Sequence, residues 1–164
     1  MTPLSAAAIA AAMKAMGSVP PPIEVVASID STNRRLLEDG PVDGGWHALL
    51  TEEQTAGRGR RGRRWQGSRG GNLAMSVGWS YGGPLSRLPP LSLVVGVAVA
   101  RAIESLYGAA LRLKWPNDIL LEQKKLGGIL VETRMASASG CWVVIGIGIN
   151  GRLDVTADGV DQPW

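Results

Sequence analysis

The sequence predicts an α+β fold, with a mixed, mostly antiparallel sheet and helices packed on one face of it. Helix-forming segments occupy the first part of the chain, whereas short β-rich runs separated by turn residues fill residues 111–149. The length of 164 residues suits one hydrophobic core and is too short for two domains of ordinary size. Hairpins late in the chain argue against a doubly wound sheet, which needs strands alternating with helices.

Residues 1–22 are expected to form a short N-terminal helix and a linker. Residues 5–16 are strong helix formers, and Gly17 and the prolines at 20–22 end the helix. Residues 23–29 then favour a strand. A second short helix is predicted over residues 34–38, because residues 30–33 can cap its start and Gly40 follows its end.

The middle of the chain combines a long loop with a long apolar helix. Residues 46–52 and 72–81 favour strands, and residues 54–71 are rich in glycine and arginine without apolar periodicity, which predicts a loop. A helix that begins at Pro89-Pro90 and ends near Gly108 is expected to be the principal core helix. Apolar side chains that it carries include Leu91, Val94, Val97, Ala98 and Ile103, and it continues to Leu106.

Four short strands are predicted after this helix, at residues 111–115, 119–122, 128–134 and 142–149. Turn residues separate them at 116–118 and 123–125. We therefore expect one domain over residues 1–164, with a core at 23–150 and a polar tail at 151–164.

The net charge of +3 depends on one short segment. Five of the thirteen arginines lie in residues 57–64, and without these five positive charges the net charge would be −2. A concentrated cluster suits a compact anion such as a nucleotide polyphosphate, although it does not exclude RNA.

Several classes of protein are disfavoured by composition. Cys141 is the single cysteine and His47 the single histidine, so neither an internal disulfide nor a cysteine- or histidine-rich metal site is expected. The apolar run at residues 91–100 stops at Arg101, short of the roughly 20 residues that span a bilayer. The N-terminus also lacks the pattern of a secretory signal. These features predict a cytoplasmic protein that does not cross a membrane.

Three stretches could carry chemistry. The first is Gly-Arg-Gly-Arg-Arg-Gly-Arg-Arg-Trp at 57–65, where amides and guanidinium groups could bind phosphate and the indole could stack on a base. The second joins Lys-Trp-Pro-Asn-Asp at 114–118 to Lys-Lys-Leu-Gly-Gly at 124–128, and the third is Gly-Ile-Gly-Ile-Asn at 146–150. Taken singly, they are equally compatible with a solvated basic loop, an RNA-binding segment, a hairpin with exposed lysines, and a strand weakened by glycine.

Taken together and in order, these motifs resemble the catalytic domain of the biotin protein ligases. The resemblance covers residues 31–150, through the segments 31–33, 54–63, 114–118, 125–132 and 146–150. It implies the catalytic fold shared by biotin ligases and class II aminoacyl-tRNA synthetases. It also implies two reactions: biotin and ATP form biotinyl-5′-adenylate, and a lysine of a biotin carboxyl carrier protein then receives the biotinyl group.

The resemblance also implies roles for particular residues. Lys125, Arg60 and Asp118 are the expected catalytic residues, and Asp118 either binds Mg²⁺ with the ATP phosphates or helps to deprotonate the acceptor lysine. The expected biotin-binding residues are Ser31, Thr32, Asn33, Gln54, Gly57, Arg58, Lys125, Gly128, Ile129, Gly146 and Gly148. The expected ATP- and adenylate-binding residues are Arg58, Arg60, Arg63, Trp65, Lys114, Asn117, Lys125 and Asn150. Ser31 is equally suited to cap a helix, and Arg61 and Arg64 are expected to be solvated.

The sequence departs from the pattern of the biotin protein ligases in two places, before residue 23 and after residue 150. No helix-turn-helix is expected before residue 23, so DNA binding is not expected, and residues 151–164 are not expected to form the family's C-terminal β-barrel. The expected partner is the carrier protein, and the chain itself is expected to be a monomer or a weak homodimer.

Two alternative functions are a lipoyl or octanoyl acyltransferase and a non-catalytic RNA-binding module.

Overall fold

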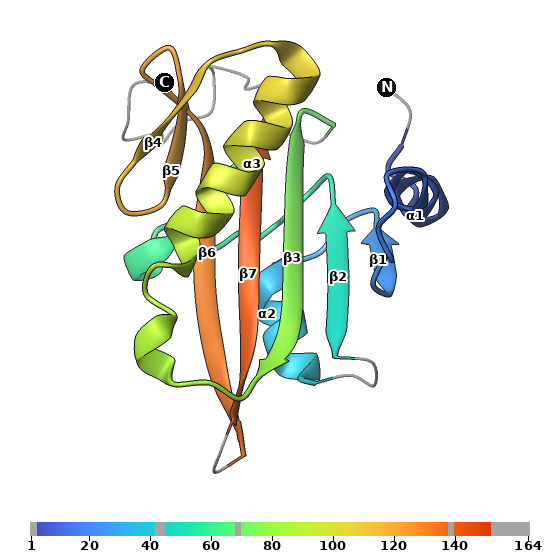
Figure 1. Cartoon of the computed structure of the whole chain (residues 1–164), viewed down its shortest axis with the longest axis vertical. Coiled ribbons are helices and arrows are strands. Elements are labelled where there is room, and N and C mark those ends of the chain that lie inside the picture. Colours follow the sequence, from blue (N-terminus) through green and yellow to red (C-terminus); the bar gives the residue numbers. More distant parts are fainter. Residues whose placement is uncertain (1–2, 42–44, 68–69, 138–139, 152–164) are drawn as a thin grey trace.

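The computed structural model describes residues 3–41, 45–67, 70–137 and 140–151. Seven strands form one sheet in the order β1-β2-β3-β7-β6-β5-β4 (Figure 1). The strands are β1 (Ile23–Val26), β2 (Trp46–Thr51), β3 (Asn72–Tyr81), β4 (Leu111–Lys114), β5 (Asp118–Leu121), β6 (Lys124–Ser137) and β7 (Gly140–Asn150). The helices are α1 (Ala6–Ala15), α2 (Thr32–Asp39) and α3 (Leu91–Tyr107), with 3-10 turns η1 (Arg60–Gly62) and η2 (Leu85–Arg87). Of the expected tail at 151–164, residues 152–164 lie outside the described residues.

The sheet confirms the predicted α+β class and the mostly antiparallel topology. Only the pair β1 and β2 is parallel among the described strands, and each other pair of neighbours is antiparallel. The predicted strand at residues 72–81 coincides with β3, and Gly108 ends α3 in the left-handed conformation with a φ of 66°.

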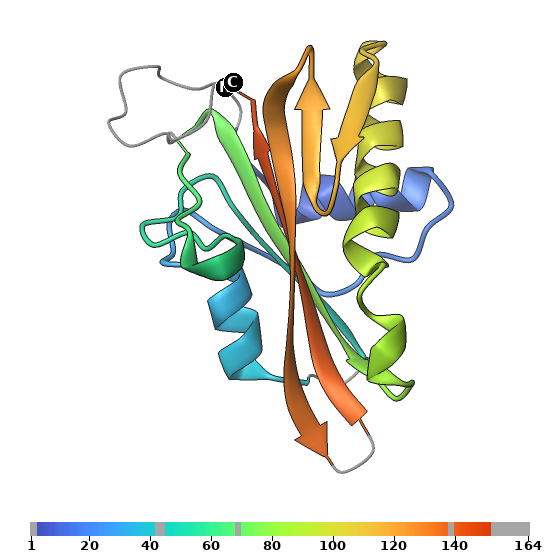
Figure 2. The same ribbon diagram turned by 90° about the vertical axis from the view of Figure 1, so that its left-hand side faces the viewer.

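The helices do not share one face of the sheet, so that part of the prediction is wrong. Leu36 of α2 packs with Trp142 and Val144, whereas α3 packs against the cluster that contains Ile145 and Ile147. Successive side chains of a strand point to opposite faces, so these residues of β7 face α2 and α3 alternately. Figure 2 shows α2 and α3 on opposite sides of the sheet. Apolar side chains run along β7 without alternation because both of its faces are covered.

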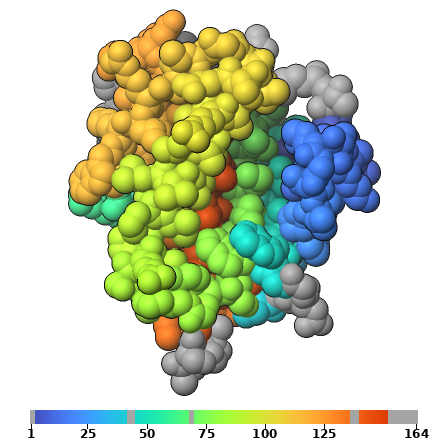
Figure 3. Space-filling view, viewed as in Figure 1, coloured from blue at the N-terminus to red at the C-terminus, as the bar shows by residue number. Residues whose placement is uncertain are grey.

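The face of α3 that packs on the sheet also differs from the prediction. Leu91, Val95 and Val99, spaced four residues apart, contact the sheet, while Val94 and Val97 are 61% and 38% exposed. The helix α3 itself carries apolar residues on all of its sides, so the periodicity of the sequence does not identify its buried side. In Figure 3, atoms of β3 and β7 are visible between α3 and α1.

Length and composition do not exclude a membrane span, contrary to the expectation from sequence. The helical segment Leu85–Tyr107, which joins η2 to α3, is long and apolar enough to cross a bilayer, and few of its residues are buried. In the structure its second part packs on β4, β5 and β6.

The hairpin between β5 and β6 turns earlier than predicted. Glu122 and Gln123 adopt positive φ angles of 48° and 70°, so the turn lies there. Lys124 and Lys125 belong to β6 and not to the predicted turn at 123–125. The side chain of Lys125 is therefore carried by a strand within the sheet.

Candidate functional site

The face of the sheet that α2 covers becomes hollow along β7. Residues of β7 on this face change from Trp142 and Val144 to Gly146 and Gly148. In register beside the two glycines lie Ala74 and Ser76 of β3, and Gly128 and Leu130 of β6. Except for Leu130, these residues are small, so the three adjacent strands leave space beside the first turn of α2 and form the floor of a pocket.

The N-terminus of α2 forms one wall of the pocket. Ser31 caps the helix, since its Oγ accepts a hydrogen bond from the Arg34 amide at 3.4 Å, and it also lines the pocket. Both expected roles of Ser31 are therefore compatible with the structure. The Thr32 amide donates to Oε1 of Gln54 at 2.9 Å, which draws the segment after β2 against the helix. Asn33 lies close above Gly146, where an added Cβ would contact the Asn33 side chain.

The arginine-glycine segment forms a second wall and contains more regular backbone structure than the predicted loop. The Gly59 amide donates to the Arg63 carbonyl at 2.8 Å, and the Trp65 amide donates to the Gly57 carbonyl at 2.9 Å, which closes a small hairpin around η1. Arg58 forms an ion pair with Glu132 at 2.8 Å.

Trp65 lies directly on the glycine floor. A Cβ at Gly148 would overlap its indole ring, and a Cβ at Gly128 would lie 3.2 Å from it. The Lys125 ammonium lies 5.7 Å from the centre of the same ring. A base could stack on this indole only after a change in its packing, so its expected contact with adenine stays a prediction.

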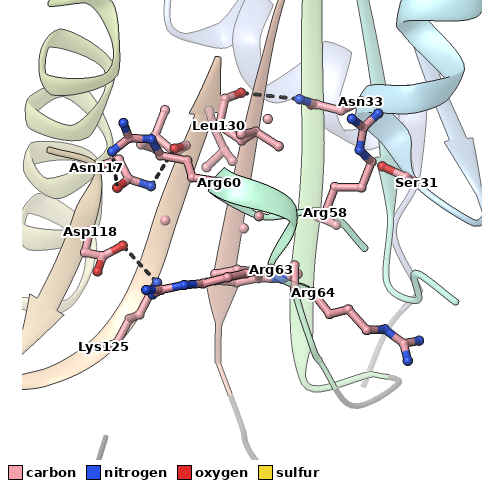
Figure 4. Close-up of a pocket in the computed structure, with 18 of the residues that line it drawn as sticks. Ser31, Asn33, Arg58, Arg60, Arg63, Arg64, Asn117, Asp118, Lys125 and Leu130 are labelled. Carbon is pink, nitrogen blue, oxygen red and sulfur yellow. Dashed lines mark hydrogen bonds and ion pairs between the residues drawn. The ribbon is translucent and has the colours of Figure 1, made fainter. Parts of the chain in front are cut away.

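The third wall comes from the segment between β4 and β5 and from the start of β6. Lys125 Nζ lies 2.8 Å from Asp118 Oδ1, and the Arg60 guanidinium donates to Asn117 Oδ1 at 3.3 Å. Figure 4 shows this group across the pocket from Ser31 and Asn33. One side of the pocket is therefore mainly neutral and polar, and the other carries several cations.

These walls enclose a cavity of about 340 Å³, which is the size of a small-molecule site. Most of the predicted site residues line it. These are Ser31, Thr32, Asn33, Gln54, Arg58, Arg60, Arg63, Trp65, Lys114, Asn117, Asp118, Lys125, Gly128, Ile129, Gly146 and Gly148.

Gly57 and Asn150 do not line the cavity. Gly57 is buried against Trp65 and Gln54, where an added Cβ would overlap the Trp65 carbonyl and lie 3.1 Å from Nε2 of Gln54. Asn150 ends β7, and its buried Oδ1 lacks a hydrogen-bond partner among the described residues. Arg61 and Arg64 are exposed as expected, and they also line the cavity at its edge.

Sequence reasoning assigned no role to Ser76, Leu130 or Glu132. Ser76 is fully buried and its Oγ lies 2.7 Å from Thr32 Oγ1 and 2.6 Å from Asn33 Oδ1. Glu132 accepts a hydrogen bond from Asn33 and pairs with Arg58. A serine at the centre of an apolar strand was the available signal for Ser76, but only the register with Gly146 connects it to the pocket.

The charged groups of the pocket do not form a preassembled metal site. Among the described residues no group of three or more histidine, cysteine, aspartate or glutamate side chains could hold a metal ion. Hydrogen bonds to Glu38 and Asp39, together with the charges of these carboxylates, raise the pKa of Arg34 and Arg35, but neither arginine lines the cavity.

Residues 25–150, which include the whole floor of the pocket, match the family described as the biotin/lipoate A/B protein ligase family. The chain belongs to this family. The bifunctional ligase/repressor BirA of Escherichia coli (strain K12) is 41% identical over 145 residues, covering 87% of this chain and 44% of BirA.

Solved structures of the biotin/lipoate A/B protein ligase family share the fold. A biotin protein ligase from Leishmania major, in complex with biotinyl-5-AMP, matches with a TM-score of 0.67 and 32% identity over 80% of this chain and 57% of that one. The enzyme from Aquifex aeolicus, in complex with biotin and ATP, matches with a TM-score of 0.65 and 34% identity over 84% and 56% of the two chains. These matches confirm the predicted biotin ligase-like catalytic fold. The chain spans about half the length of these relatives.

Proposed function

We propose that this chain carries the biotin-activating site of a biotin protein ligase. The observation that supports this most directly is the division of one cavity into a neutral polar wall and a cationic wall. Thr32 and Gln54 suit the uncharged head group of biotin, and Lys125 and Arg60 suit its carboxylate and the phosphates of ATP. The similarity to structures that bind biotin with ATP supports the same function.

In the first reaction a carboxylate oxygen of biotin attacks the α-phosphorus of ATP. The bond between the α-phosphorus and the bridging oxygen breaks, and pyrophosphate leaves. Negative charge accumulates on the phosphate oxygens in the transition state, and a fixed cation stabilises it. Lys125 is suited to this role because Asp118 holds its ammonium at 2.8 Å, on the cationic wall.

ATP would bring Mg²⁺ as its counter-ion. Mg²⁺ commonly uses one or two carboxylates together with substrate phosphates, and Asp118 offers one carboxylate at the cationic wall, so the residues present fit the ion. The ion would neutralise part of the phosphate charge. Asp118 itself orients Lys125 through their ion pair.

In the second reaction the neutral amine of a carrier lysine attacks the acyl carbon of biotinyl-5′-adenylate. The bond from the acyl carbon to the phosphate oxygen breaks, AMP leaves, and an amide forms as the amine loses a proton. Arg60 and Arg63 line the cavity and are exposed, so they can hold the adenylate phosphate while the carrier approaches. The carrier would be the biotin carboxyl carrier domain of a biotin-dependent carboxylase.

The experiment that tests this function measures the two reactions separately. Exchange of labelled pyrophosphate into ATP, dependent on biotin, reports adenylate formation, and mass spectrometry of a carrier domain reports transfer. Lipoate and octanoate serve as alternative acids, because the family includes ligases for lipoate. Exchange that responds to lipoate and not to biotin would overturn the proposal.

Replacement of Arg60 by glycine should release the adenylate from the site. Arg60 links η1 to Asn117 by the 3.3 Å hydrogen bond, and its loss removes both a phosphate ligand and a contact across the cavity. We expect biotin to appear on lysines of a bystander protein such as serum albumin, measured by streptavidin blotting. The matched control is Arg87→Gly, which changes an arginine outside the cavity. Equal labelling of the bystander by wild type and Arg60→Gly would contradict this role.

Replacement of Gly148 by alanine should raise the KM for biotin by about 5- to 150-fold. The added Cβ would overlap the Trp65 ring on the floor of the pocket, and overpacking of this kind typically costs about 1–3 kcal/mol. Gly82→Ala is the matched control, because a Cβ there meets no atom within 4 Å. An unchanged KM in Gly148→Ala would show that this floor does not contact biotin.

A further inference from the structure

A chain of polar contacts runs behind the neutral wall of the pocket, from α2 through β3 to β6. Thr32 Oγ1 lies 2.7 Å from Ser76 Oγ, which in turn lies 2.6 Å from Asn33 Oδ1. Asn33 Nδ2 donates to Glu132 Oε2 at 3.0 Å and to the Leu130 carbonyl at 3.3 Å. Thr32, Asn33 and Ser76 are all at most 3% exposed, so bulk water does not satisfy these groups.

Glu132 determines the orientation of the Asn33 side-chain amide, that is, which side carries the oxygen and which the NH₂ group. Its carboxylate accepts hydrogen bonds and is paired with Arg58 at 2.8 Å. The Leu130 carbonyl is also an acceptor, so the NH₂ group of Asn33 must face both of them. The Asn33 oxygen therefore faces Ser76, and Ser76 must donate its single proton to that oxygen.

The direction of the next hydrogen bond follows from the same count of protons. Ser76 has no second proton, so the 2.7 Å contact with Thr32 is a hydrogen bond only if Thr32 is the donor. Thr32 Oγ1 also lies 3.1 Å from Gln54 Oε1. The contact with Ser76 is shorter, at 2.7 Å, so we assign the hydroxyl proton of Thr32 to the hydrogen bond with Ser76. Gln54 Oε1 already accepts the Thr32 amide hydrogen at 2.9 Å.

Thr32 and Gln54 both line the cavity. When the Thr32 hydroxyl donates to Ser76, Thr32 Oγ1 and Gln54 Oε1 face each other as two acceptors 3.1 Å apart, with no proton between them. A ligand N–H group placed between them would supply the missing donor. A cyclic urea such as the head group of biotin has such N–H groups, whereas the dithiolane of lipoate and the alkyl chain of octanoate do not.

We propose that Ser76, held by Asn33 and Glu132, is a positioning residue that fixes Thr32 as a hydrogen-bond acceptor and so selects an acid whose head group carries an N–H donor. The proposal rests on the biotin-activating function and deepens it. In the absence of Ser76 the Thr32 hydroxyl is free to donate to Gln54, which uses the acceptor that the ligand needs.

The test uses Ser76→Ala, Thr32→Val and the double variant in biotin-dependent pyrophosphate exchange. Ser76→Ala should raise the KM for biotin about tenfold, which corresponds to one lost hydrogen bond, while kcat and the KM for ATP stay the same. The double variant should have the same KM as Thr32→Val, because Ser76 acts through Thr32. Ser80→Ala, an exposed position on the same strand, is the matched control.

A second measurement separates this positioning role from a general loss of stability. Calorimetric binding without ATP compares biotin with an analogue methylated on both ureido nitrogens. Ser76→Ala should weaken biotin about tenfold and leave the weaker affinity for the methylated analogue unchanged. The proposal is overturned if Ser76→Ala lowers the affinity for both ligands by the same factor. It is also overturned if the effects of Ser76→Ala and Thr32→Val on the KM for biotin add fully in the double variant.

The two proposals fail in different ways. If the wild type exchanges pyrophosphate with biotin and Ser76→Ala has an unchanged KM for biotin, only the role of Ser76 is overturned. If the wild type binds biotin without exchange and Ser76→Ala binds biotin more weakly, only the adenylation function is overturned. Wild type that does not bind biotin overturns both.

Discussion

Replacement of Lys125 by alanine is expected to lower biotin-dependent adenylate formation by about 100- to 1000-fold. Removal of one preorganised group that stabilises transition-state charge typically costs about 2.7–4 kcal/mol. Lys125 is such a group, because β6 carries its backbone, Asp118 holds its ammonium, and the ring of Trp65 lies beside it. The measurement is pyrophosphate exchange at saturating biotin and ATP, with thermal unfolding to confirm that the variant is folded.

The adjacent lysine provides the control for Lys125. Lys124 is exposed at the start of β6 and does not line the cavity, so Lys124→Ala removes the same charge without removing a pocket group. We expect its exchange rate to stay near that of wild type. If Lys125→Ala and Lys124→Ala lose the same small fraction of activity, the cation at residue 125 does not act on the reacting phosphate.

The order and type of the elements could be predicted from local signals, whereas the faces on which the helices pack could not. Caps and glycines mark the helix ends, as Ser5 and Gly108 show. β7 and α3, by contrast, are apolar on all sides. Val144 and Ile145 are both β-branched apolar residues of one strand, yet Val144 faces α2 and Ile145 faces α3. Only the long-range strand register assigns each to its layer.

The pocket was predictable where glycines and charges stand out, and was missed where the signal depends on register. Gly146 and Gly148 are visible as small residues in an apolar strand, and both line the cavity, while their contact with biotin stays a prediction. Ser76 stands out only as a polar residue in an apolar strand, and nothing local shows that it lies beside Gly146 and behind Thr32. The sequence predicts that Trp65 contacts the adenylate, but its position on the floor depends on a long-range contact that no local signal shows.

Replacement of Trp142 by alanine is expected to lower the free energy of unfolding by about 3–5 kcal/mol. Trp142 is fully buried between α2 and the sheet, and its Nε1–H donates to the Leu36 carbonyl at 2.7 Å. Domains are typically stable by about 5–15 kcal/mol, so this loss removes a large fraction of the stability. Chemical denaturation followed by circular dichroism measures the change.

The same substitution should also damage a pocket that Trp142 does not line, because α2 carries Thr32 and Asn33 at its first turn. Loosening α2 moves these side chains away from Ser76, so the KM for biotin should rise while the KM for ATP changes less. Trp142→Phe keeps most of the packing but leaves the buried Leu36 carbonyl without its donor. It should therefore cost about 1–3 kcal/mol and keep the variant folded enough to assay. Trp46→Ala is the matched control, since Trp46 is 51% exposed and stacks on Trp79 away from α2. If Trp142→Phe and Trp46→Ala lower stability equally and neither raises the KM for biotin, then the packing of α2 on β7 does not hold the biotin wall in place.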